Sequence, residues 1–358
     1  MPDAPAHRPR MSLLDRFLPV WILVAMAAGL ALGRLVPGLG EALGDLKVNG
    51  ISLPIAVGLM VMMYPPLAKV RFDKARQVAA DRRVMVVSLI LNWLVGPALM
   101  FALAWLFLFD QPELRTGVII VGLARCIAMV LVWSDLSCAD REVTAVLVAV
   151  NAVFQVLMFG VLGWFYLEAL PGWLGLPGSP VDFSLGAIVG AVLVFLGVPL
   201  AAGAASRVIG ERTRGRRWYE ERFLPAVSPL ALIGLLYTIV LLFSLQGEKI
   251  TAQPLTVARV ALPLLAYFLL MFALALFTAR AAGLNYARST SVAFTAAGNN
   301  FELAIAVCIG TFGAASAPAL AGTIGPLIEI PVLVGLVYVA LWAGPRLFPG
   351  NPTVPVAR

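Results

Sequence analysis

The sequence is poor in charged residues and in metal-binding side chains. Aspartate, glutamate, lysine and arginine make up 13% of its 358 residues, whereas a soluble domain has roughly 25%. It holds one histidine, His7, and three widely spaced cysteines without a paired-cysteine motif. We therefore expect neither a disulfide framework nor a structural zinc site, and we expect no cofactor.

Hydrophobic residues dominate instead, at 61% of the chain, and the mean hydropathy is +0.94. Several apolar runs exceed the roughly 18 residues that indicate a transmembrane helix. We therefore expect an all-α integral membrane protein with ten transmembrane helices. The expected spans are 17–36, 50–68, 84–109, 116–134, 143–167, 183–206, 223–245, 256–279, 289–313 and 317–345.

The net charge of +7 does not indicate nucleic-acid binding, because the basic residues lie in the loops between apolar runs. Most of them fall on the side of the N-terminus, which the positive-inside rule makes cytoplasmic. We expect a multi-pass protein of the bacterial inner membrane, in contact with membrane lipid. Both tails, 1–16 and 346–358, are then cytoplasmic, and the oligomeric state stays open.

Two long basic loops, 69–83 and 207–222, follow the second and sixth spans and suggest an internal repeat. The segment 52–56 at the start of the second span also resembles 228–232 at the start of the seventh. With five helices in each repeat, the second repeat is inverted, as in many transporters that bind substrate near the membrane midplane. The expected organisation is a first repeat at 17–168, an extracytoplasmic loop at 169–182 and a second repeat at 183–345.

The fourth span carries an arginine and a cysteine side by side, Arg125 and Cys126, in an otherwise uncharged segment. A lone cysteine in an apolar helix is usually a small packing residue. Beside an arginine its thiolate is favoured, and sulfur binds thiophilic metals and metalloids better than it binds Na⁺ or Ca²⁺. A soft metal or metalloid substrate is therefore one hypothesis.

The ninth span carries Asn299, Asn300 and Glu302 at the place that corresponds to the Arg125–Cys126 pair in the other half. An acid at membrane depth costs about 2.5–3.5 kcal/mol and usually faces a cavity or a partner. Glu302 is therefore a candidate carboxylate for proton or cation coupling. The alternative is a structural salt bridge between Glu302 and Arg125, and the two interpretations are compatible if the pair breaks in another state.

Glycines precede both polar clusters, Gly122 in the fourth span and Gly298 in the ninth. They are positions where each helix could unwind, and irregular backbone at membrane depth occurs where it lines a cavity or is buried in protein. We therefore expect both helices to be discontinuous.

Other polar residues are candidates for supporting roles. Asn151 and Gln155 lie one turn apart on the fifth span and either face the same cavity or make interhelical hydrogen bonds. Glu329 is a second membrane acid, and the prolines at 326 and 331 on either side suggest a broken helix.

The motifs resemble a known family. Gly-Leu-Ala-Arg-Cys-Ile-Ala-Met-Val at 122–130, followed by Trp133 and Asp140-Arg141-Glu142, is similar to the fourth-helix signature of the arsenical-resistance arsenite efflux permeases. Gly-Asn-Asn-Phe-Glu-Leu-Ala-Ile-Ala-Val at 298–307 resembles their ninth-helix signature. These permeases belong to the bile acid/sodium symporter superfamily, and the resemblance covers essentially the whole chain.

The resemblance implies a five-plus-five inverted repeat in which helices four and nine break and cross. Spans 3–5 and 8–10 would form a core domain, and spans 1, 2, 6 and 7 a panel domain. The family's required cysteine and glutamate map to Cys126 and Glu302. Its activity is the export of trivalent arsenic, as arsenite and in some members antimonite, driven by the proton gradient.

We therefore expect a proton-coupled arsenite exporter. Cys126 would contact arsenic, Asn299, Asn300 and Glu302 would bond its hydroxyls, and Glu302 would also carry the proton. A site made by all three thiols, with Cys138 and Cys308, is disfavoured because transport needs binding weak enough for release.

Two other functions stay open at this point. The first is sodium-coupled transport of an organic anion, with Arg125 pairing a carboxylate and the Asn-Asn-Glu cluster holding Na⁺. The second is an intramembrane enzyme, which is disfavoured because the spans hold no Ser–His, paired-aspartate or HExxH arrangement.

Overall fold

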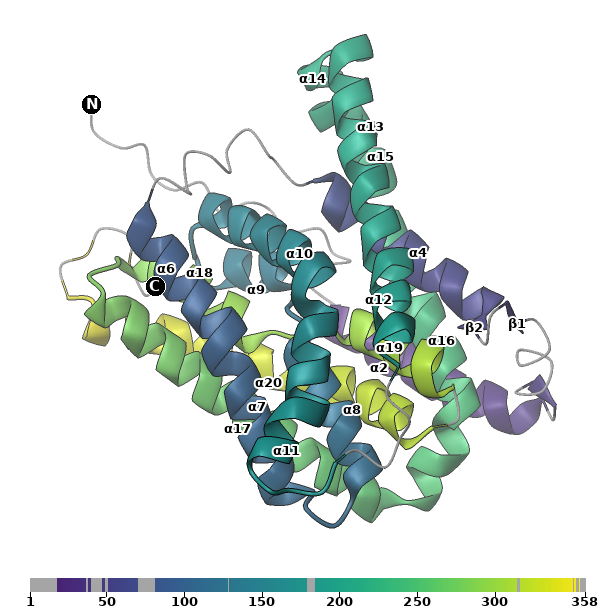
Figure 1. The fold of residues 1–358 in the computed structure, drawn as a ribbon. Helices are drawn as coiled ribbons and strands as arrows, with labels where there is room; N and C mark the ends of the chain where they lie inside the picture. Colours follow the sequence, from purple (N-terminus) through teal and green to yellow (C-terminus); the bar gives the residue numbers. More distant parts are fainter. Residues whose placement is uncertain are drawn as a thin grey trace, which may run out of the picture.

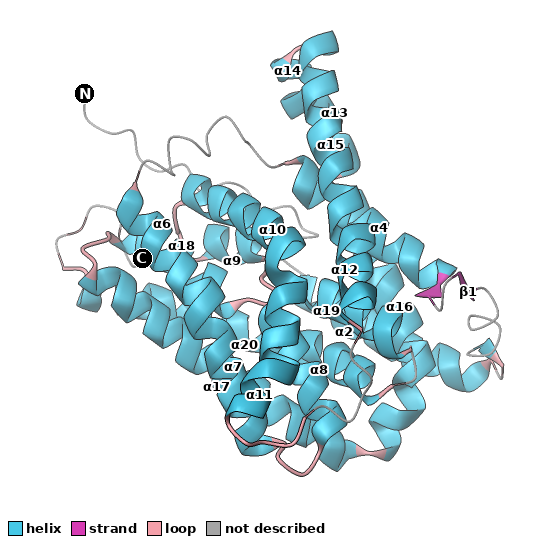
Figure 2. Cartoon of the chain, in the orientation of Figure 1, coloured by secondary structure: helices cyan, strands magenta, loops and turns pink. Residues whose placement is uncertain are grey.

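The computed structural model is almost entirely helical (Figures 1 and 2). It describes residues 18–36, 38–39, 47–48, 51–69, 81–127, 129–178, 184–313, 316–349, 351 and 354. The expected N-terminal tail, most of the basic loop at 69–83, the second part of the loop at 169–182 and most of the C-terminal tail lie outside the described residues.

Helices occupy each of the ten expected segments. In the first half these are α2 (Leu18–Leu35), α4 (Leu53–Ala68), α6 (Arg82–Ile90), η1 (Leu91–Val95), α7 (Gly96–Phe107), α8 (Pro112–Leu123), α9 (Val130–Leu136), α10 (Arg141–Trp164), η2 (Phe165–Ala169) and α11 (Leu170–Trp173). A two-residue antiparallel pair, β1 (Lys47–Val48) and β2 (Ile51–Ser52), precedes α4.

The second half of the chain is also helical. Its helices are α12 (Leu185–Val192), η3 (Leu193–Gly197), α13 (Val198–Arg214), α14 (Arg216–Trp218), η4 (Tyr219–Phe223), α15 (Leu224–Val227), α16 (Pro229–Ala252), α17 (Pro254–Ala281), α18 (Tyr286–Ala297), α19 (Phe301–Phe312) and α20 (Ala317–Leu347). Across the described residues, six continuous helical stretches are long and apolar enough to cross a membrane, and three shorter helices are also apolar. The chain is therefore a helical, multi-pass membrane protein.

Four of the long helices contain a π-helical turn that ends just before a proline. In each case the residue before the proline donates its N–H to the carbonyl five residues back, as Gly96 does to Leu91 and Val198 does to Leu193. A proline lacks an N–H and its ring pushes against the carbonyl four residues earlier. The wider turn makes room for that ring, so the helix continues through the proline.

Two expectations about these helices are wrong. The prolines at 326 and 331 do not break the last helix, because α20 runs without interruption through both. Transmembrane helices tolerate proline where neighbouring groups satisfy the freed carbonyls. The segment 207–222 is helical on both sides of Gly215 rather than a loop, since pairs such as Arg216–Glu220 and Arg217–Glu221 stabilise it at i,i+4 spacing.

The helices pack as two groups. Helix α16 packs mainly on α2 and α4, and α13 also packs on α4. Helices α7, α8, α17, α18 and α20 pack mainly on one another, while α12 packs on both α10 and α19. Figure 1 shows α4 and α16 on the opposite side of the molecule from α6 and α17, with α13–α15 projecting at one end.

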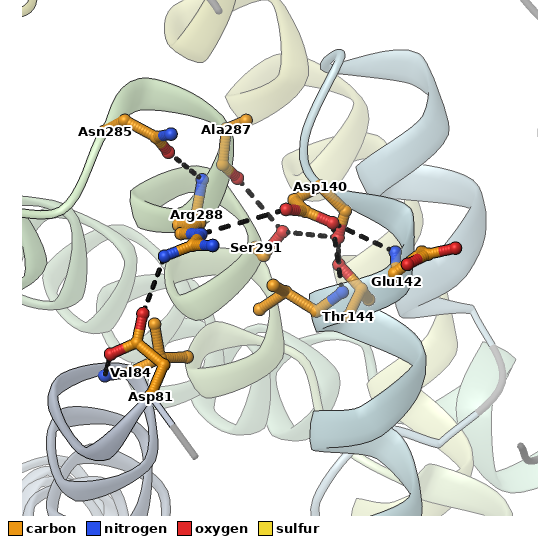
Figure 3. Close-up of polar contacts among 10 residues, drawn as sticks. Asp81, Val84, Asp140, Glu142, Thr144, Asn285, Ala287, Arg288 and Ser291 are labelled. Atoms are coloured by element: carbon orange, nitrogen blue, oxygen red, sulfur yellow. Dashed lines mark hydrogen bonds and ion pairs between the residues drawn. The ribbon is translucent and has the colours of Figure 1, made fainter. Parts of the chain in front are cut away.

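A polar network joins the beginnings of three helices in the second group (Figure 3). Asp81 caps α6, Asp140 caps α10 and Asn285 caps α18 through backbone N–H groups of the first turn. The Arg288 guanidinium donates to Asp81 Oδ2 at 2.6 Å and lies 3.9 Å from Asp140. Ser291 Oγ donates to the Asp140 carbonyl oxygen at 2.9 Å. The start of α18 is therefore fixed to both neighbouring helices.

Candidate functional site

Two helices stop in the middle of the protein, and the chain leaves each of them in extended backbone. Helix α8 ends at Leu123, and Ala124 is extended. Helix α18 ends at Ala297, Gly298 is extended, and α19 begins at Phe301. Asn300 starts α19 by accepting a hydrogen bond from the Leu303 N–H through its side-chain oxygen, at 3.0 Å. Both breaks fall within a few residues of Gly122 and Gly298, where the sequence predicts them.

The two breaks lie side by side and pair with each other. Arg125 and Asn299 form an isolated antiparallel bridge. The Cys126 N–H donates to the Gly298 carbonyl at 3.2 Å, and the Asn300 N–H donates to the Ala124 carbonyl at 3.0 Å. We call the paired segments 124–127 and 298–300 the crossover. It satisfies backbone groups that broken helices would otherwise leave unpaired in an apolar interior.

The side chain of Arg125 holds the crossover to a third helix. It is fully buried. Its guanidinium donates to the carbonyl oxygens of Gly122 and Ala296 and to the hydroxyl of Tyr267 on α17. Among the residues that the structure describes, no carboxylate lies within ion-pairing distance of Arg125. The alternative of a salt bridge between Arg125 and Glu302 is therefore wrong for this state.

The Asn299 side chain bonds the end of the other broken helix, α8. Its Nδ2 donates to the carbonyl oxygens of Val121 at 2.8 Å and Ala124 at 3.1 Å. These carbonyls lie at the end of α8, where a helix leaves carbonyl groups without a regular N–H partner. The Val121 carbonyl also accepts from the Ala124 N–H at 3.1 Å. The Asn299 N–H donates to the carboxylate of Glu329 at 3.2 Å. Glu329 thus supports the crossover from within the continuous helix α20.

Helix α10 supports the crossover from the other side. Gln155 Oε1 accepts from the Arg125 N–H at 2.9 Å, and Gln155 Nε2 donates to the Asn151 carbonyl at 3.2 Å. The Asn151 side chain accepts from Trp93 Nε1 at 3.1 Å and donates to Asn92. For Asn151 the interhelical hydrogen-bonding interpretation is therefore the one that the structure supports, and Gln155 contacts the crossover directly.

Cys126 lies at the centre of the crossover and is 2% exposed. A Cβ atom on Gly298 would come within 3.0 Å of Cys126 Cβ and 3.6 Å of Cys126 Sγ. A glycine at 298 therefore leaves the space next to the thiol open. Cys138 is in the turn before α10 and Cys308 is buried farther along α19, and no cluster of three metal-binding side chains occurs among the described residues.

Several buried polar atoms at the crossover have no hydrogen-bond partner in the part of the chain that the structure describes. They are Arg125 Nε, Asn299 Oδ1 and Asn300 Nδ2. Asn299 and Asn300 are 2% and 1% exposed. Buried polar groups in folded proteins are nearly always paired. The crossover therefore offers both a donor and an acceptor to a small polar molecule.

Glu302, in the first turn of α19, is only partly buried and lines a cavity of about 20 Å³. The cavity walls come from both helix groups: Leu59 on α4, Thr238 on α16, Ile305 on α19 and Thr323 on α20 are among them. Glu302 and Glu329 are close enough to interact electrostatically. Cys126 is not among the residues that line this cavity.

A larger cavity of about 580 Å³ opens at the end of the protein where α4 stops and α10 begins. Charged side chains of both signs line it, including Lys69, Arg141, Glu142, Arg207 and Glu220. It lies between α4, α13, η4 and α15 on one side and α9 and α10 on the other. None of the predicted site residues is among the described residues that line it.

Sequence reasoning missed two residues of this region. Tyr267 lies in an apolar run on α17 and gives no sign of its contact with Arg125, which is 142 residues away. Thr238 lies in an apolar run on α16. A single hydroxyl among apolar residues is a weak signal, because threonine usually bonds the backbone of its own helix.

Residues 56–253 match the family described as the sodium bile acid symporter family. The arsenical-resistance protein Acr3 of Corynebacterium glutamicum is 70% identical over 346 residues, which cover 97% of this chain and 94% of that protein. The arsenical-resistance protein Acr3 of Alkaliphilus metalliredigens is 31% identical over 340 residues, or 92% and 93% of the two chains.

An uncharacterized transporter of Synechocystis is 34% identical over 365 residues, which cover 96% of this chain and 92% of the relative. The similarity extends over nearly the whole length of all three relatives. The chain therefore belongs to the sodium bile acid symporter family, in the branch formed by the arsenical-resistance proteins.

Proposed function

We propose that this transporter exports arsenite across the bacterial cytoplasmic membrane in exchange for protons and so confers resistance to arsenic. The 70% identity to an arsenical-resistance protein supports the substrate class. The alternative of an intramembrane enzyme is excluded, because the family consists of transporters.

One structural observation carries the choice of substrate. The crossover combines an acceptor, Asn299 Oδ1, and a donor, Asn300 Nδ2, which have no partners among the described residues, with the thiol of Cys126 on the paired segment. Arsenite at neutral pH is mostly the uncharged trihydroxide. It needs hydrogen bonds to its hydroxyls and a soft ligand for arsenic, and this set of groups supplies both.

Glu302 is the proposed coupling residue. Its carboxylate lies in a small cavity with largely apolar walls, where a proton or a bound polar substrate is needed to offset the loss of hydration. Protonation from outside would release the substrate's hydroxyl, and loss of the proton to the cytoplasm would restore the acceptor. Alternation between proton and substrate at one carboxylate gives antiport.

The proposed organisation is ten transmembrane helices in two inverted repeats, 17–168 and 183–345, with both termini in the cytoplasm. The group that contains α2, α4, α13 and α16 is the panel domain, and the group that contains the crossover is the core. The 580 Å³ cavity lies between these groups at the basic end of the protein. It is the proposed cytoplasmic entrance.

The partners of Arg125 argue against the organic-anion alternative. Its guanidinium already donates to two carbonyl groups and to Tyr267 in the interior. A substrate carboxylate would have to displace these contacts. We therefore assign Arg125 the role of an anchor for the crossover rather than an anion-binding residue.

The direct test is the accumulation of arsenite in everted membrane vesicles with and without a pH gradient. Gradient-dependent accumulation is expected for the wild-type protein. Glu302→Gln, inserted at normal levels, should abolish it, whereas sodium-dependent accumulation without a pH requirement would contradict the proposal.

A further inference from the structure

The small cavity beside Glu302 has a second polar wall residue, on the opposite helix group. Thr238 on α16 lines it across from Glu302 on α19. Thr238 is 3% exposed, and its hydroxyl has no hydrogen-bond partner within the described part of the chain. A buried hydroxyl without a partner is rare in folded proteins.

The state of this hydroxyl differs from that of three other buried threonines, whereas the buried hydroxyl of Thr290 also has no partner within the described residues. The hydroxyls of Thr144, Thr295 and Thr323 donate to the carbonyl oxygen four residues earlier in their own helices, at 2.6–3.0 Å. In an apolar interior, the hydroxyl of a helical threonine ordinarily finds its hydrogen-bond partner in this way. Thr238 does not make this bond, although Thr323 does so on the wall of the same cavity.

The packing around Thr238 leaves space for its hydroxyl. A Cβ atom on Gly58 of α4 would come within 2.6 Å of Thr238 Oγ1. Only a glycine at this position of α4 lets the hydroxyl occupy its place without a shift of either helix. The hydroxyl therefore lies in the contact between α4 and α16, where the absence of a side chain at residue 58 gives it room.

In this state the cavity beside Thr238 is too small for the substrate. A volume of about 20 Å³ holds about one water molecule, which is less than a trihydroxide of arsenic requires. The walls belong to two helix groups that contact each other weakly at this point. A small separation of α16 from α19 and α20 would enlarge the cavity between the two polar residues.

We propose that Thr238 is a substrate-contacting residue, whose hydroxyl bonds a hydroxyl of the arsenic trihydroxide on the side opposite to Glu302. This inference rests on the proposed function. The substrate site is then formed by both helix groups. Thr238 comes from one group, and the other group supplies Cys126, Asn299, Asn300 and Glu302. Specificity for a polyhydroxylated neutral substrate then depends on α16 as well as on the crossover.

The test is the concentration dependence of sodium arsenite uptake into everted vesicles. Thr238→Val keeps the shape and removes the hydroxyl, so KM should rise about two- to tenfold, which corresponds to one hydrogen bond. The maximal rate should stay close to that of the wild type. Thr238→Ser keeps the hydroxyl and should restore the wild-type KM, while Thr238→Ala should behave like Thr238→Val.

Thr323→Val is the matched control, because it removes a hydroxyl from the same cavity that is already bonded to Ala319. It should leave KM close to the wild-type value. An unchanged KM in an active Thr238→Val protein, or a Thr238→Ser protein as defective as Thr238→Val, would overturn the inference and leave the proposed function standing. Wild-type vesicles that take up no arsenite would overturn both.

Discussion

Arg125 and Asn299 each bond the helix end that the other residue follows. The Arg125 guanidinium donates to the Ala296 carbonyl at the end of α18, and the Asn299 amide donates to the Val121 carbonyl at the end of α8. Their backbones also form the antiparallel bridge of the crossover. Each broken helix is thus completed by a side chain of the other, and the two breaks form one structural unit.

Tyr267→Phe should destabilise this unit. The hydroxyl accepts from Arg125 and donates to the Ala296 carbonyl at 3.1 Å. Its removal leaves a buried charged donor short of a partner, which costs about 1–3 kcal/mol. A lower midpoint of thermal unfolding in detergent is expected. Tyr338→Phe, at a side chain that is 70% exposed, is the control, and an equal decrease in both variants would contradict the role of Tyr267.

Cys126→Ser should abolish arsenite efflux without loss of membrane insertion, because oxygen is a poor replacement for sulfur as a ligand of arsenic. Cys138→Ser and Cys308→Ser should retain efflux, since neither cysteine lies at the crossover. Arsenite resistance of cells and uptake into everted vesicles measure the effect. Equal loss in all three variants would favour a site made by three thiols.

Gly325→Ala should disturb the start of α19. A Cβ atom at this position of α20 would overlap the ring of Phe301, which directly precedes Glu302. Overpacking of this kind costs about 1–3 kcal/mol, and displacement of Phe301 should also reduce efflux. Gly335→Ala in the same helix is the control, because a Cβ atom there meets no atom within 4 Å. Wild-type efflux and stability in Gly325→Ala would show that Phe301 moves freely.

Asp140→Ala should destabilise the protein more than Arg288→Ala does. Asp140 accepts two backbone hydrogen bonds at 3.1 Å at the start of α10, and the loss of such a cap costs about 0.5–2 kcal/mol. Arg288 is 41% exposed in its ion pairs, where a pair contributes about 0–1 kcal/mol. Thermal unfolding of the two variants gives the order, and the reverse order would show that the network of Figure 3 acts through Arg288.

Much of the helical pattern can be predicted from the sequence, because long apolar runs separated by charged loops leave little alternative in a membrane. The breaks near Gly122 and Gly298 could also be predicted, since polar pairs follow both glycines. The prolines around Glu329 gave a wrong prediction, because a proline shows the loss of one hydrogen bond and not whether the neighbours compensate for it.

The site could be predicted in part. The polar residues of the fourth and ninth spans do meet, but the sequence could not decide whether Arg125 faces Glu302 or backbone carbonyls. That choice depends on the path of α17, which brings Tyr267 to the guanidinium. Thr238 could not be predicted at all. The observation that points to it is a buried hydroxyl without a hydrogen-bond partner, and sequence patterns carry no information about unpaired groups.

The four π-helical turns also affect how mutations in these helices should be planned. Each holds one residue more than a regular turn, so the residues after Val95, Ala169, Gly197 and Phe223 are rotated by about 100° relative to an uninterrupted helix. A helical wheel drawn through such a turn assigns the later side chains to the wrong face. Deleting one residue within the turn would restore the regular spacing and leave the later side chains on their present faces, but it would remove the room that the wide turn gives the proline ring.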